Sequence, residues 1–203
     1  MTYQHILGRI RSSVARDAYL AGTGSVPAGQ LAAMQEVATL VADPYIAADS
    51  VRRRIHQLHA SGRLDRVMKL SALGVLAASP RVRDFAEASR LAGQQELVAL
   101  EEGGPNREVY LASADRHRGV LAFLMGHHEV ALDWFSRALE RERSAQNVGN
   151  VLACLLQLDD PAAATDLMRQ VLRGWSEHDR QALEELIRAD DDLAPLRAGA
   201  AEG

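Results

Sequence analysis

The feature that most constrains this chain is the placement of small residues in the stretch that begins at Gly119. Gly119, Ala131 and Ala138 carry little or no side chain, so two antiparallel helices can approach closely at these positions. Gly126 lies between the two helical segments and can form the turn, and Phe135 can fill the space between the helices. The stretch therefore predicts a tightly packed helix–turn–helix unit.

The composition predicts an all-α protein. Hydrophobic residues make up 47% of the chain but aromatic residues only 4%, so Ala, Leu and Val must dominate the core, as suits closely packed helices. The single Cys154 excludes an internal disulfide, and no Cys/His spacing predicts a zinc site or another cofactor. The N-terminal sequence lacks the uninterrupted apolar segment of a secretory signal, and no run approaches the ~20 apolar residues of a membrane span. We therefore expect a cytoplasmic protein without membrane insertion.

Apolar residues recur at helical spacing along the whole chain, and Gly, Pro and Ser separate the segments. The first stripe comprises Ile6, Ile10, Val14 and Ala18, and the third helix is expected to begin at a cap formed by Asp49 or Ser50. We expect further helices over residues 31–41, 64–78, 82–100, 109–125, 130–140, 145–158, 162–172 and 179–197. The loop at 101–106 predicts a boundary between an N-terminal helical region (1–102) and a C-terminal module (107–203).

A repeat connects the last helices. Ala164, Met168 and Leu172 follow Ala131, Phe135 and Leu139 at a separation of 33 residues. This pattern resembles the tetratricopeptide repeat, whose unit is about 34 residues, over residues 107–174. The first unit departs from the pattern at Arg118, where the family has a large apolar residue. The second departs at Leu152 and Val171, where the family has small residues, so its register is left open. The resemblance implies a short α-solenoid of antiparallel hairpins with a C-terminal capping helix, and leaves open whether residues 1–102 are diverged repeats.

The resemblance implies a non-catalytic module that binds a protein or peptide, as an adaptor, scaffold or chaperone. In this family the first helix of each repeat lines a groove. On this chain the matching positions are Ser113, Arg116, Val120, Phe123, Gln146, Asn150 and Gln157. Arg116 could pair with a carboxylate of the partner, and Phe123 could anchor an apolar side chain. The alternative for Val120 and Phe123 is that they pack in the core. The alternative for the polar residues is that they lie on solvated surface. Exposed Trp134 and Trp175 could also support a homo-oligomer.

DNA binding is the alternative function. Residues 1–70 carry nine Lys or Arg and five Asp or Glu, whereas residues 71–203 carry 14 and 22. The segment from Ala47 to Leu64 resembles the recognition helix of winged helix-turn-helix regulators. In that reading the contacts with nucleic acid would come from Arg52, Arg53, Arg54, His56 and Arg63. The residues that follow predict a helix where a β-wing would be needed, and this argues against nucleic acid as the partner.

Overall fold

The computed structural model describes residues 28–102 and 107–197, and these residues form helices without a β-strand. The predicted all-α class is therefore confirmed for the described part of the chain. The predicted stripe Ile6–Ala18 lies outside the described residues. The helices are α2 (Ala28–Ala42), α3 (Ala48–Ala60), α4 (Arg66–Ala78), α5 (Phe85–Glu102), α6 (Arg107–Leu124), α7 (His128–Arg141), α8 (Ala145–Gln157), α9 (Pro161–Gly174), α10 (Glu177–Ala189) and the 3-10 helix η1 (Asp191–Leu196).

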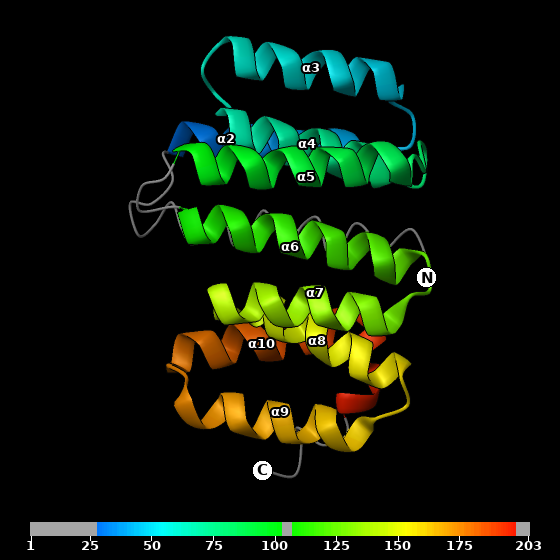
Figure 1. Cartoon of the computed structure of the whole chain (residues 1–203), viewed down its shortest axis with the longest axis vertical. Coiled ribbons are helices and arrows are strands. Elements are labelled where there is room, and N and C mark those ends of the chain that lie inside the picture. The colour runs from blue at the N-terminus through cyan, green and yellow to red at the C-terminus, as the bar shows by residue number, and fades with distance from the viewer. Residues whose placement is uncertain (1–27, 103–106, 198–203) are drawn as a thin grey trace.

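The helices form an elongated stack in which neighbours in sequence pack on one another, with α3 at one end and α9 at the other (Figure 1). Contacts between alternate helices join α2 to α4, α4 to α6 and α8 to α10. One apolar cluster lies among α2, α3 and α4, and another extends from α6 to η1. Between them, Ala77, Ala88, Leu91 and Leu121 join α4, α5 and α6. Packing therefore continues across the loop at which we predicted a boundary.

Local sequence explains where α4, α8, α9 and α10 begin. Asp65, Ser144, Asp160 and Ser176 each accept a hydrogen bond from a backbone N–H in the first turn of the helix that follows. Pro161 occupies the first turn of α9, where its missing N–H costs nothing. The predicted cap of α3 is wrong: α3 begins at Ala48, and neither Asp49 nor Ser50 precedes it. Helix α3 can form without a side-chain cap, because the packing of its apolar face stabilises it more than a cap would.

The close approach predicted at Gly119 is present in the structure. A Cβ atom built on Gly119 would lie 2.5 Å from Cδ1 of Phe135, so no side chain fits there. Phe135, Ala131 and Ala138 are fully buried. Gly126 has a φ of +80°, a left-handed conformation that glycine adopts without strain, and so forms the turn between α6 and α7. The helix–turn–helix unit predicted from this stretch is confirmed.

Arg81 stabilises the turn between α2 and α3, in the N-terminal part of the stack. It follows α4, and its guanidinium donates hydrogen bonds to the carbonyl oxygens of Leu40 (2.9 Å), Val41 (2.7 Å) and Asp43 (2.7 Å), and to that of Ile46. The last carbonyls of a helix have no partner within the helix, and they attract a positive charge. Arg81 therefore closes the C-terminus of α2 and holds the turn into α3.

In the part of the chain that the structure describes, no helix combines the length and the apolar character that a membrane span requires.

We predict that Gly119→Ala lowers the free energy of unfolding by about 1–3 kcal/mol, the usual cost of an overpacked core. The matched control is Gly74→Ala in the middle of α4, where the nearest heavy atom to an added Cβ is the Cβ of Leu91 at 3.9 Å. Alanine is the better helix former, so this control should gain about 0.5–1 kcal/mol. Urea unfolding of both variants measures the difference. Equal stabilities would contradict the close approach.

A second prediction concerns Arg81→Met, which keeps an apolar stem but removes every hydrogen bond to the carbonyls of α2 and its turn. Hydrogen bonds to a charged group contribute about 1.5–3 kcal/mol each, and water replaces part of that loss, so we expect destabilisation by about 3 kcal/mol. Hydrogen exchange should accelerate most in α2 and α3. Exposed Arg83 provides the control, because Arg83→Met should change the free energy of unfolding by less than about 0.5 kcal/mol.

Candidate functional site

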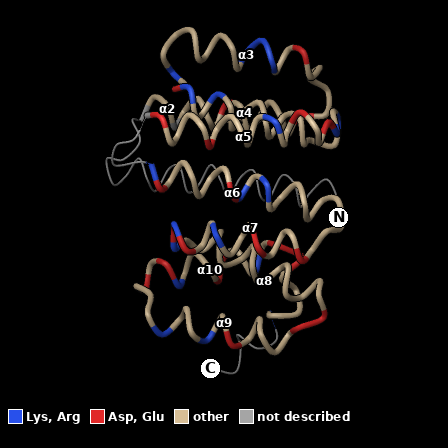
Figure 2. Tube along the Cα trace, viewed as in Figure 1, with Lys and Arg blue, Asp and Glu red and all other residues tan. Residues whose placement is uncertain are grey.

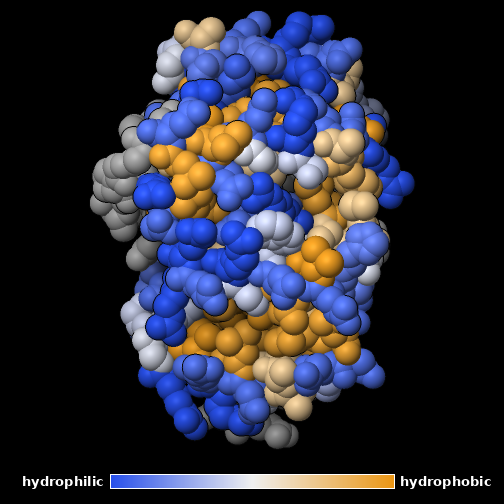
Figure 3. Space-filling view, in the orientation of Figure 1, coloured by the Kyte–Doolittle hydropathy of each residue, from blue (hydrophilic) through white to orange (hydrophobic). Residues whose placement is uncertain are grey.

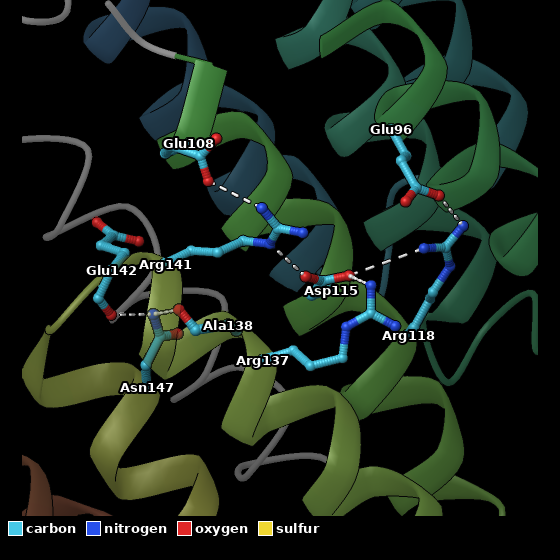
Figure 4. Close-up of polar contacts among 9 residues, drawn as sticks. All are labelled: Glu96, Glu108, Asp115, Arg118, Arg137, Ala138, Arg141, Glu142 and Asn147. Carbon is cyan, nitrogen blue, oxygen red and sulfur yellow. Dashed lines mark hydrogen bonds and ion pairs between the residues drawn. The ribbon is translucent and has the colours of Figure 1, made fainter. Parts of the chain in front are cut away.

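The contact between α6 and α7 contains a buried carboxylate with arginines around it (Figure 4). The side chain of Asp115 is 3% exposed, and its Oδ2 accepts a hydrogen bond of 2.9 Å from Nε of Arg141. Nη1 of Arg118 and Nη2 of Arg137 each lie 3.8 Å from its Oδ1. A buried carboxylate is stable only when it is paired, and these arginines supply the pairing.

Two further carboxylates complete this cluster. Arg118 donates to Glu96 of α5 at 2.6 Å, and Arg141 donates to Glu108 of α6 at 2.8 Å. Burial lowers the pKa of Arg141, but its hydrogen bonds to Glu108 and Asp115 outweigh burial and leave the pKa raised. The guanidiniums of Arg118 and Arg137 also lie over the ring of Trp134, 4.8 and 4.5 Å from its centroid. Three arginines thus face three carboxylates, and the cluster joins α5, α6 and α7. Because the charges balance, the cluster has no excess positive charge that would bind an anion.

Arg116, which we predicted to face a partner, points into the protein. It is 3% exposed, its Nη1 donates to Oδ1 of Asn147 at 3.2 Å, and the same atom lies 3.7 Å from Oε2 of Glu142. Nδ2 of Asn147 in turn donates to the carbonyl oxygens of Ala138 and Glu142 at 3.2 and 2.8 Å. These contacts connect α6 to α8 and to the end of α7. In this structure the guanidinium of Arg116 holds helices together.

The other predicted groove residues differ in exposure. Phe123 is 4% exposed and contacts His128 edge to face, with 4.9 Å between the ring centroids. Gln146 and Asn150 are also buried, and Ser113 and Val120 are half-buried. Only Gln157, at the end of α8, is exposed. The structure therefore does not bring these seven side chains together on an open surface.

Some of the basic residues that we predicted to bind nucleic acid form ion pairs within the protein. Glu36 of α2 pairs with Arg54 at 2.5 Å and with Arg63 at 3.5 Å, and the hydrogen bond from Arg54 holds the pKa of Glu36 below its usual value. Arg53 and His56 are exposed on α3, and Arg52 is half-buried. Burial, with the charges of Lys69, Arg52 and His59, lowers the pKa of His56, so His56 adds little positive charge near neutral pH. Among the described residues α3 is followed by α4, so the β-wing is not found there.

Apolar surface lies elsewhere, across the face between α7 and α9 (Figure 3). The partly buried apolar side chains that α7, α8 and α9 pack on the C-terminal core include Leu132, Leu139, Leu155 and Leu167. We call these four residues the apolar band. Contact between apolar surface and water is unfavourable, and an exposed apolar patch is typical of an interaction site.

Neither the cluster around Asp115 nor the apolar band was predicted from the sequence. Asp115 stands beside Arg116, and only the helix phase decides which of the two meets the arginines of α7. The band had a clearer signal, because Leu132 and Leu139 are seven residues apart and therefore share one edge of α7. The two tryptophans singled out for self-association are both half-buried, Trp134 beneath two arginines and Trp175 against the C-terminal core.

Residues 28–102 and 107–197 contain no group of three or more His, Cys, Asp or Glu side chains that could hold a metal ion. No family model, curated protein or solved structure matches the chain.

We predict that Asp115→Asn lowers the free energy of unfolding by about 2–4 kcal/mol. Removing one partner of a buried ion pair costs about 3–5 kcal/mol, and the partial exposure of the arginines reduces this cost. The control is Asp133→Asn on the exposed side of α7, which should change stability by less than about 0.5 kcal/mol. Chemical denaturation at neutral pH measures both. Equal effects would show that the cluster does not stabilise the α6–α7 contact.

Proposed function

We propose that this chain is a non-catalytic protein-interaction module whose helices α6 to α9 form two tetratricopeptide-like repeats. The contact between Gly119 and Phe135 and the turn at Gly126 agree with the repeat pattern. At a separation of 33 residues, Ala131 and Ala164 are both fully buried, which supports the register of the second repeat. These observations support the repeat arrangement through its packing.

The departure at Arg118 has a physical explanation that fits this proposal. The family pattern has a large apolar residue there, and Arg118 instead lies over the ring of Trp134 while it pairs with Glu96. A guanidinium can stack on an aromatic ring and still form hydrogen bonds in its plane. Arg118 can therefore replace an apolar contact between α6 and α7.

The apolar band is the observation that carries the proposed binding function. The band residues extend over three consecutive helices, and each keeps part of its side chain in contact with solvent. By contrast, Arg116, Phe123, Gln146 and Asn150 are buried. We therefore assign partner binding to the band in preference to the groove positions.

The test is affinity capture from the native host with the full chain and with Leu132→Gln/Leu167→Gln. Glutamine keeps side-chain length but removes apolar contact, and losing two anchors should weaken capture of a specific partner about 10-fold or more. Val130→Gln is the matched control, because Val130 is 50% exposed on the opposite edge of α7. Circular dichroism and thermal unfolding check that all variants fold alike.

Two results would contradict this proposal: no protein captured specifically by the full chain, or specific partners retained equally by the band variant and the control.

A further inference from the structure

The two edges of α7 carry different residues: one contacts the ionic cluster around Asp115, and the other carries the first residues of the apolar band. On one edge Trp134, Arg137 and Arg141 face the cluster around Asp115. A helix turns about 100° per residue, so Leu132 and Leu139 lie on the other side of the buried line that runs through Phe135. The positive charges of α7 are thus used on one edge, and the apolar band begins on the other.

The band edge of α7 is acidic. Glu129, Asp133 and Glu140 are all exposed, and on a helical wheel they border the positions of Leu132 and Leu139. The exposed base nearest in sequence is Arg137, whose guanidinium lies over the ring of Trp134 and 3.8 Å from Asp115, on the other edge of α7. On α9, Asp166 is paired with Arg169 at 2.8 Å and Arg173 is also exposed, so α9 adds no negative charge to the band. The α7 edge therefore favours a partner with positive charge beside its apolar residues.

A second copy of this chain fits this surface poorly. Residues 107–197 contain 11 Arg and 16 Asp or Glu, a net charge of −5, and Figure 2 shows charged positions of both signs on α7 and α9. A two-fold interface brings the same patch of each copy together, so the acidic edges would approach one another. Like charges across an interface oppose association.

The geometry points to an amphipathic helix of a partner protein as the occupant of the apolar band, and we propose that Lys or Arg residues flank the apolar stripe of that helix. This inference rests on the function proposed above and specifies the chemistry of the partner. Leu132 and Leu139 are two helical turns apart, the spacing at which a helix repeats its own apolar anchors. The apolar stripe would cover the band, and the basic flank would face Glu129, Asp133 and Glu140.

The test uses two fluorescent helical peptides of about 18 residues that share one leucine stripe, with Lys flanks in one peptide and Glu flanks in the other. Fluorescence anisotropy against the full chain should show binding of the Lys peptide about 10-fold tighter at low salt, and high salt should remove the difference. Leu132→Gln/Leu167→Gln should weaken binding of the Lys peptide, whereas Val130→Gln should not. Glu129→Lys/Asp133→Lys/Glu140→Lys changes only exposed residues and should reverse the preference.

The inference is overturned if the Glu peptide binds as tightly as the Lys peptide, or if the preference survives the charge reversal. It is also overturned if neither peptide binds, or if light scattering shows a dimer that Leu132→Gln dissociates. In each of these cases the capture experiment still decides the proposed function, because capture depends on the band and not on the charge of the peptides.

Discussion

The contact between Gly119 and Phe135 is the constraint on which the C-terminal half depends. Because residue 119 has no side chain, the ring of Phe135 can lie against the backbone of α6. This approach fixes how far α7 stands from α6 and which way it is rotated. The rotation turns Arg137 and Arg141 toward Asp115 and leaves Leu132 on the other edge. The lack of a side chain at residue 119 thus determines which residues of α7 contact α6 and which face solvent.

The ionic cluster shows why a count of charges does not identify a binding site. Asp115 and Arg116 are adjacent and both buried, yet they serve different contacts, Asp115 with α7 and Arg116 with Asn147 of α8. The arginines nearest to them are neutralised within the protein. The exposed charges that α7 places beside Leu132 and Leu139 are Glu129, Asp133 and Glu140, whereas Arg137, which is also exposed, lies on the other edge.

The fold could be predicted largely from the sequence because its determinants are local. Apolar spacing, the turn at Gly126 and the start of α9 at Pro161 depend on neighbouring residues. The site could not be predicted in the same way. Arg116 and Asn147 are 31 residues apart, and their hydrogen bond depends on how α6 meets α8. Side-chain chemistry alone made Arg116 resemble a residue that binds a partner, and only the packing shows that it is buried.

Arg81 has a consequence for how the chain can vary. It recognises the turn between α2 and α3 through backbone carbonyl oxygens, which every amino acid presents. The contact itself uses no side chain of that turn, and Tyr45 is 95% exposed. Substitution at Tyr45 preserves the carbonyls that Arg81 binds, so Tyr45 is a suitable position for a label that leaves the helices in place.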